Sequence, residues 1–349
     1  MSDITTSRRT TIPGTAEPGW SEVCEALERL LALNGDATVD LERLKSRVYR
    51  LHAGTNGERQ SFVLKRYDPW LARRNELVLR RWLPALGLAD RVPRLVASAA
   101  ERTGACVWHV YEDLGDGALD PAAADPPRVQ AAVELIAELH IRAAGHPLVP
   151  ECRHFCGSLG ASFFANNVRD AIAALEAVAP PRVEPTPAQG ELRGRLLMRL
   201  YRLRDDLPRR VQRLEALGGP DTLLHGDLWT TNTLVTDTPK GLEARLIDWD
   251  HAAVGPVSYD LSTFLYRFPR ATRPWVLERY TRAVARAGWQ LPELPDLNRL
   301  FETAEYARYA NRIIWPALAL AQDRALWGFD QLAEIEHWFD DLELAVPDA

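Results

Sequence analysis

The alternation of hydrophobic and polar residues predicts a small antiparallel sheet in the N-terminal part of the chain. Short apolar runs rich in Val, Phe, Leu and Tyr, the residue types that favour strands, are separated by polar turns. These runs lie at residues 38–44, 48–51, 61–64 and 107–111. Apolar residues at near-helical spacing around Trp82 predict a helix over residues 74–86 within this part. The N-terminal part is therefore expected to be a strand-rich lobe with a helix.

The rest of the chain has a mainly helical pattern. Helical periodicity occurs at residues 129–141, 161–177, 192–217, 274–287 and 297–320. Residues 116–127, rich in Gly, Pro, Ala and Asp, predict a connector between the two parts. We therefore expect an α+β fold with a lobe at 1–115 and a helical lobe at 116–349.

Four polar residues lie where short buried strands are expected to end. Apolar pairs that predict these strands stand at 223–224, 234–235 and 246–247. Next to them come His225, Asp227, Asn232 and Asp248. Functional side chains are often carried at such strand ends, so this region is the candidate site.

The residue types in this region suit phosphoryl transfer. The reaction needs a carboxylate that orients and deprotonates the attacking hydroxyl, and oxygen ligands for Mg²⁺ on the phosphates. Asp227 and Asn232 are separated by four residues, as are the catalytic Asp and the metal-binding Asn of protein kinases. This spacing predicts Asp227 as the base and Asn232 and Asp248 as Mg²⁺ ligands.

With these motifs the chain resembles the aminoglycoside phosphotransferase and choline kinase family. The resemblance rests on His-Gly-Asp-x-x-x-x-Asn at 225–232, followed by Ile-Asp-Trp at 247–249. It implies a protein-kinase-like fold of two lobes and a small-molecule kinase that uses ATP and Mg²⁺. It also implies that His225 orients the catalytic loop, and that Asp260 ties this loop down, although a helix N-cap alone would also explain Asp260.

The resemblance also implies a set of nucleotide-binding residues. Lys65, one of only three lysines in the chain, matches the strand lysine that binds the α and β phosphates, and Glu76 matches the helix glutamate that holds it. A surface lysine and a solvated glutamate are the alternatives. Tyr111 and Asp113 resemble the hinge that reads adenine through main-chain groups. Ser46 is expected to contact phosphate, although its turn lacks the glycines usual in the family.

A small hydroxylated acceptor is expected rather than a protein. Trp229 stands where a protein kinase would carry a lysine, and Asp260 comes only twelve positions after Asp248. This interval leaves little room for a peptide-docking segment. An inactive nucleotide-binding module is the alternative, but such a module would have no need of Asp227.

The charge of the C-terminal segment bears on the acceptor. Residues 296–349 contain eleven acidic residues and four arginines, a net charge of −7. An acidic pocket wall would favour a cationic acceptor such as an aminoglycoside or an amino alcohol. Solvated helix faces explain most such clusters, so a neutral sugar, a macrolide or a homoserine-like acceptor stays open.

Composition narrows the remaining function classes. The net charge of −6 argues against a nucleic-acid partner. No apolar run reaches eighteen residues and residues 1–14 are polar, so we expect no membrane partner and a cytoplasmic location. Cys152 and Cys156, with His154 between them, lack a fourth zinc ligand nearby and are expected to be free thiols. Nothing in the sequence specifies an oligomeric state.

Overall fold

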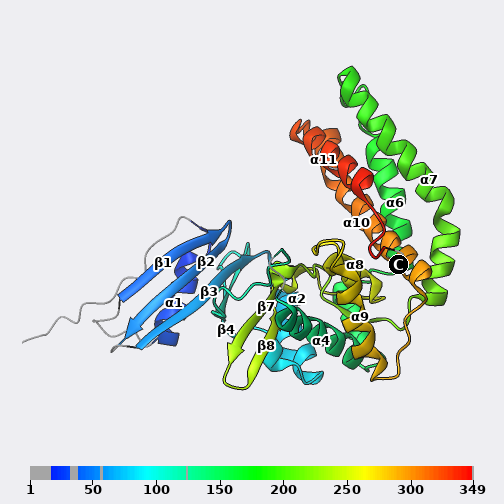
Figure 1. The fold of residues 1–349 in the computed structure, drawn as a ribbon. Coiled ribbons are helices and arrows are strands. Elements are labelled where there is room, and N and C mark those ends of the chain that lie inside the picture. The colour runs from blue at the N-terminus through cyan, green and yellow to red at the C-terminus, as the bar shows by residue number, and fades with distance from the viewer. Residues whose placement is uncertain (1–16, 32–37, 56–57, 123–124, 348–349) are drawn as a thin grey trace, which may run out of the picture. The chain divides into compact units, whose positions relative to one another are not determined.

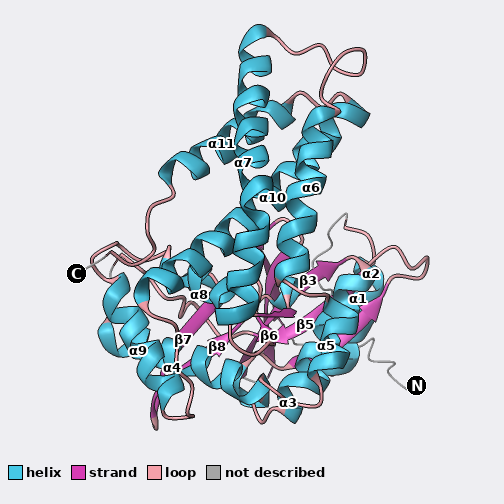
Figure 2. Cartoon of the chain, turned by 90° about the vertical axis from the view of Figure 1, so that its right-hand side faces the viewer, coloured by secondary structure: helices cyan, strands magenta, loops and turns pink. Residues whose placement is uncertain are grey.

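The computed structural model describes residues 17–31, 38–55, 58–122 and 125–347. It confirms the α+β class, with a small antiparallel sheet in one part and mainly helices in the other (Figures 1 and 2). The chain forms two compact units. The first contains residues 1–118 and 233–250, and the second contains residues 119–232 and 251–349.

These units differ from a single division after residue 115. Segment 233–250 returns to the first unit as a hairpin of β7 (Thr233–Thr238) and β8 (Gly241–Leu246). The Val235 N–H donates to the Gly117 carbonyl at 2.8 Å, which ties the hairpin to the end of the N-terminal segment. This segment carries Asp248 and therefore brings part of the candidate site into the first unit.

The first unit is built around a five-stranded antiparallel sheet in the order β1-β2-β3-β5-β4. Its strands are β1 (Thr38–Lys45), β2 (Val48–Thr55), β3 (Glu58–Tyr67), β4 (Leu95–Ala100) and β5 (Val107–Glu112). Helix α1 (Trp20–Leu31) packs on the sheet through a core that includes Trp20, Leu27, Leu51 and Trp108 (Figure 1). Apolar burial on this face fixes the register that presents Lys65 on the other side of β3.

Helix α2 (Pro69–Leu77) begins five residues before the predicted start. Asp68 stands at its N-cap position and Pro69 at its first helical position, where the missing N–H costs nothing. A π-helical turn (Val78–Trp82) and the short α3 (Leu83–Ala85) continue it. The early start places Arg74 and Asn75 in the middle of a regular helix, where they reach the candidate site.

The second unit consists mainly of helices around a two-stranded sheet of β6 (Thr222–Leu224) and β9 (Ala253–Gly255). Its helices are α4 (Pro126–Ala143), α5 (Val149–Cys156), α6 (Ala161–Glu176), α7 (Pro187–Leu217), α8 (Ser258–Leu265), α9 (Arg273–Ala285), α10 (Leu294–Asp323) and α11 (Trp327–Asp341). Helices α6, α7, α10 and α11 lie side by side and share one apolar core (Figures 1 and 2). Helix α8 is buried along its whole length.

The described helices include none that is long and apolar enough to cross a membrane. Residues 1–14, on which the expected cytoplasmic location rests, lie outside the described residues. Within the described ranges, Cys152 and Cys156 form no disulfide.

Candidate active site

In the first unit, Lys65 lies between two carboxylates. Its Nζ atom is 2.6 Å from Asp248 Oδ1 and 2.8 Å from Asp250 Oδ2. Burial lowers the pKa of Lys65, but the two carboxylates outweigh burial and hold this pKa above its ordinary value. The ammonium therefore stays charged at neutral pH and can bind an anion.

Asp250 is a site residue that the sequence analysis did not single out. Its Oδ1 accepts a hydrogen bond from Asn75 Nδ2 at 3.1 Å, and its main-chain carbonyl accepts one from Arg74 at 2.8 Å. Burial and the neighbouring Asp248 raise the pKa of Asp250. Helix α2 thus holds Asp250, which in turn holds Lys65.

Asp248 has an unusual backbone conformation. Its φ angle of 65° lies in the left-handed region, which non-glycine residues seldom adopt. Such strain persists where the surroundings enforce it, and it is concentrated at functional sites. The conformation places the partly exposed Asp248 carboxylate beside Lys65.

Among the described residues, Glu76 pairs with His109 and Arg73 rather than with Lys65, and a role of Glu76 in nucleotide binding stays a prediction. Glu76 Oε1 lies 3.5 Å from His109 Nε2, and Oε2 lies 3.7 Å from Arg73. Within the part of the chain that the structure describes, no ion pair joins Glu76 to Lys65. Burial lowers the pKa of His109 to about 4, so Glu76 faces a neutral imidazole at pH 7. Glu76 does not reach Lys65 because the Lys65 ammonium is paired with Asp248 and Asp250.

Ser46 lies at the exposed two-residue turn between β1 and β2. The turn contains no glycine, and Arg47 supplies the positive φ of 64° instead. The Arg47 carbonyl accepts a hydrogen bond from the Arg66 N–H at 2.9 Å, which fixes the turn on β3. The structure thus shows how the turn forms without glycine, while phosphate contact by Ser46 stays a prediction.

The expected hinge residues make contacts within the fold. The Tyr111 side chain is buried, and its hydroxyl is 2.9 Å from His109 Nδ1. The Asp113 N–H donates to the Ser61 carbonyl at 3.3 Å, and the Asp113 carboxylate accepts hydrogen bonds from Ser61 and from Gly115 N–H. Burial raises the pKa of Asp113, but these hydrogen bonds and Arg50 outweigh burial and hold the pKa below its ordinary value. Adenine contacts by Tyr111 and Asp113 stay a prediction.

In the second unit, the catalytic loop follows β6 and is anchored by Asp260. The buried Asp260 carboxylate accepts hydrogen bonds from the His225 N–H at 2.7 Å and the Gly226 N–H at 2.9 Å. His140 Nε2 lies 3.4 Å from it. Burial would raise the pKa of Asp260, but these hydrogen bonds and nearby histidines lower it. Asp260 therefore ties down the loop, as the resemblance implied.

Gly226 leaves no room for a side chain. Its φ is +79°, and a Cβ atom built there would lie 1.9 Å from the His251 carbonyl oxygen. Glycine at this position lets the loop pass close to residue 251. The His225 side chain is fully buried beside it, which supports a positioning role for His225 rather than proton transfer.

Asp227 and Asn232 face each other across this loop. Asn232 Nδ2 donates to the Asp227 main-chain carbonyl at 2.8 Å and lies 3.4 Å from Asp227 Oδ2. The Asp227 side chain is partly exposed, whereas Leu228 beneath it is buried. The loop thus carries a partly exposed carboxylate and a partly exposed amide, which are the groups a base and a metal ligand require.

The profile of the phosphotransferase enzyme family matches residues 36–294. No curated protein matches the chain. Ethanolamine kinase from Plasmodium vivax has 13% sequence identity and a TM-score of 0.56, over 87% of this chain and 82% of its own. Spectinomycin phosphotransferase in complex with ADP and spectinomycin has 12% identity and a TM-score of 0.56, over 90% of this chain and 97% of its own.

Macrolide 2'-phosphotransferase from Brachybacterium faecium has 18% identity and a TM-score of 0.53, over 93% of this chain and 98% of its own. At these identities the likeness concerns the fold, which is that of the kinase-like phosphotransferases. The matched segment contains Lys65, Asp227, Asn232 and Asp248 and spans more than half of the chain. The chain therefore belongs to the phosphotransferase enzyme family and is a small-molecule kinase.

Proposed function

We propose that the protein transfers the γ-phosphate of ATP to a hydroxyl group of a small molecule, with Asp227 as the base. The contact between Lys65 and Asp248, which lie 183 positions apart in the sequence, is the observation that carries this proposal. It joins the strand lysine to the second acidic motif inside one unit. The charged ammonium is suited to the α and β phosphates, and the carboxylate to a metal ion on them.

The residues present also fit a Mg²⁺ ion. Mg²⁺ usually has one or two protein oxygen ligands and is otherwise bound by phosphates and water. The Asp248 carboxylate is 40% exposed, and the Asn232 amide nitrogen is used within the loop, which leaves its Oδ1 for a cation. We propose that these two residues hold Mg²⁺, which would neutralise charge on the β and γ phosphates. Tyr111, Asp113 and Ser46 complete the proposed nucleotide site.

Replacing Lys65 should weaken nucleotide binding more than replacing Glu76. A charge-assisted hydrogen bond is worth about 1.5–3 kcal/mol, so we expect Lys65→Met to raise KM for ATP about 10- to 100-fold. Asp250→Asn should raise it less, because Asp248 still holds the ammonium. Glu76→Gln should change it less than about 3-fold, since its neighbour His109 is neutral. Steady-state KM values for ATP test this order, and a Glu76→Gln defect equal to that of Lys65→Met would restore Glu76 as the partner of the lysine.

Asp248→Asn should change the metal requirement. The amide is a weaker ligand than the carboxylate, so the Mg²⁺ concentration for half-maximal activity should rise by about 10-fold or more. Asp116→Asn is the matched control, because Asp116 is an exposed carboxylate of the same unit whose one ion-pair partner among the described residues is Arg50. An unchanged Mg²⁺ titration of Asp248→Asn would remove Asp248 from the metal site.

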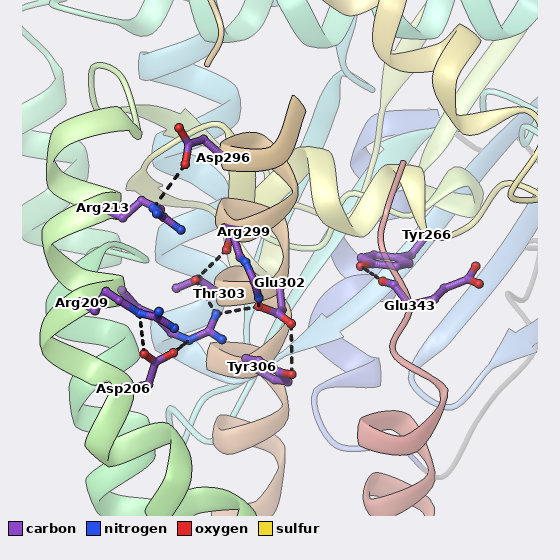
Figure 3. Close-up of polar contacts among 11 residues, drawn as sticks. Asp206, Arg209, Arg213, Tyr266, Asp296, Arg299, Glu302, Thr303, Tyr306 and Glu343 are labelled. Atoms are coloured by element: carbon purple, nitrogen blue, oxygen red, sulfur yellow. Dashed lines mark hydrogen bonds and ion pairs between the residues drawn. The ribbon is translucent and has the colours of Figure 1, made fainter. Parts of the chain in front are cut away.

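The charge of the acidic C-terminal segment is largely neutralised by arginines. Asp296 pairs with Arg213 at 3.3 Å, and Glu302 pairs with Arg210 at 2.9 Å and Arg299 at 3.1 Å (Figure 3). Further pairs join Glu305 to Arg308, Glu336 to Arg195, Asp340 to Arg199 and Glu343 to Arg273. Four of these arginines belong to α7, outside residues 296–349. The local charge of −7 therefore gives no support to an acidic pocket wall.

The acceptor class thus needs a direct screen. Candidates remain cationic acceptors such as aminoglycosides and amino alcohols, and neutral or homoserine-like ones. ATP consumption with Mg²⁺ should be followed against aminoglycosides, macrolides, choline, amino sugars and homoserine, with the product identified by mass. We expect a phosphorylated product whose formation requires Asp227. Nucleotide binding without any turnover would favour the alternative of an inactive nucleotide-binding module.

A further inference from the structure

Arg267 lies beside the catalytic loop. It follows helix α8, and its guanidinium carbon is 4.1 Å from the centroid of the Trp229 ring. Trp229 comes two residues after Asp227 and is 38% exposed. The stacking holds the long arginine side chain in one place at the surface of the loop.

Among the described residues, no carboxylate forms an ion pair with Arg267. Across residues 17–31, 38–55, 58–122 and 125–347, no ion pair involves its guanidinium, and its buried Nε has no hydrogen-bond partner. Glu305, which is almost fully buried, pairs instead with Arg308. A partly buried cation without an anionic partner is costly to the fold. The Arg267 guanidinium therefore contributes little to stability, which points to a role in binding an anionic ligand.

The surroundings of Arg267 differ from those of the neighbouring arginines. Arg308 is held by Glu305, by Thr263 and by the Tyr259 carbonyl at 3.2 Å. Arg270, three residues after Arg267, pairs with Glu343 at 3.2 Å. Arg267 is thus the arginine beside Asp227 whose donors are not taken up by the described part of the fold.

Arg267 lies near the base, because it stacks on Trp229, two residues after Asp227. Burial lowers the pKa of Arg267, and the Glu305 and Asp227 carboxylates act in the opposite direction. The guanidinium remains charged at any pH of interest. A cationic group of an acceptor would be repelled here, whereas an oxyanion would be bound by a planar fork of N–H donors.

We infer that Arg267 binds an oxyanion of the acceptor, a carboxylate or a phosphate, while the acceptor hydroxyl faces Asp227. This inference rests on the proposed function and gives it a substrate class, that of anionic alcohols such as hydroxy acids and hydroxylated phosphate esters. Arg267 is then a specificity-determining residue. Amino alcohols and aminoglycosides are disfavoured.

Matched acceptors test this inference on the wild-type protein. Homoserine, 4-hydroxybutyrate and glycerate are each compared with the corresponding primary amide, in the presence of ATP and Mg²⁺. Glycerol 3-phosphate against glycerol tests phosphate as the source of the oxyanion, and choline and ethanolamine serve as cations. We expect kcat/KM for at least one anionic member to exceed that of its neutral counterpart about 10- to 100-fold, as a charge-assisted hydrogen bond provides.

Variants connect that preference to Arg267. Arg267→Met should abolish the preference for the anion over its neutral counterpart, mainly by raising KM for the anion, and Arg267→Lys should retain part of it. Arg270→Met, an exposed arginine of the same segment, should behave as wild type.

The possible outcomes separate the two proposals. A wild-type protein that phosphorylates choline, ethanolamine or an aminoglycoside better than every anionic alcohol overturns the role of Arg267 but leaves the phosphotransferase reaction intact. An Arg267→Met protein that keeps the full preference for the anion also overturns that role. Acceptor phosphorylation that is as fast in Asp227→Asn as in wild type instead overturns the proposed function, and the inference falls with it.

Discussion

Asp227→Asn should lower kcat by about 10²- to 10⁴-fold, the usual contribution of a positioned general base. The amide has nearly the same shape as the carboxylate but cannot accept the proton of the acceptor hydroxyl. The loop should keep its conformation, because Asn232 donates its shorter hydrogen bond, at 2.8 Å, to the main-chain carbonyl of Asp227. KM for ATP should therefore stay within about 3-fold of wild type, since the substitution removes no contact that binds ATP in the ground state.

Single-turnover measurements with saturating ATP would separate the chemical step from product release. Asp221→Asn is a suitable control, because Asp221 is a partly exposed carboxylate just before β6 that pairs with Arg153 at 2.6 Å. If Asp227→Asn retained more than about a tenth of the wild-type rate, which is far above the range for loss of a base, Asp227 would be only a structural residue of the loop.

The predictable parts of the fold were those with a one-sided apolar pattern. Helix α10 was expected over most of its length because its buried residues recur at helical spacing. Helix α8 has no polar face that marks a helical period, because every residue from Ser258 to Leu265 is buried, so only the resemblance at Asp260 indicated a helix there. Strand β4 was missed because Leu95–Ala100 consists mostly of small residues without alternation.

The candidate site was predictable where chemistry fixes the spacing along the chain. The interval between Asp227 and Asn232 is such a case, and the structure shows the two side chains in contact. Asp250 and Arg267 depend on contacts between distant segments. Asn75 contacts Asp250 across 175 positions, and Arg267 is distinctive only because its neighbours are paired elsewhere.

The acidic segment also shows that contacts between distant segments are missed when a sequence is interpreted locally. Counting charges over residues 296–349 predicted an anionic surface, but helix α7 lies alongside and supplies arginines from outside that range (Figure 3). A local net charge describes a surface only when the neighbours in space are included. For this reason, the charge count over residues 296–349 does not by itself support a cationic acceptor.

Asp260→Ala should destabilise the protein by about 3–5 kcal/mol, the range for breaking a buried charged network. The change leaves the N–H groups of His225 and Gly226 buried without an acceptor, and it removes the partner of the His140 Nε2 atom. Asp260→Asn should lose less, because its amide oxygen still accepts one of the two N–H groups. Urea denaturation at neutral pH measures both losses, and Asp221→Ala, a surface pair, should cost less than about 1 kcal/mol.

The pH dependence distinguishes this network from simple packing. The pKa of Asp260 is lowered in the folded protein, so its stabilising effect is present above the unfolded pKa of about 3.9 and is lost as the pH falls through the folded value. The stability difference between wild type and Asp260→Asn should thus stay constant from about pH 7 down to about pH 5 and shrink only at more acidic pH. A loss below about 1 kcal/mol for Asp260→Ala would mean that the catalytic loop holds its conformation without this anchor.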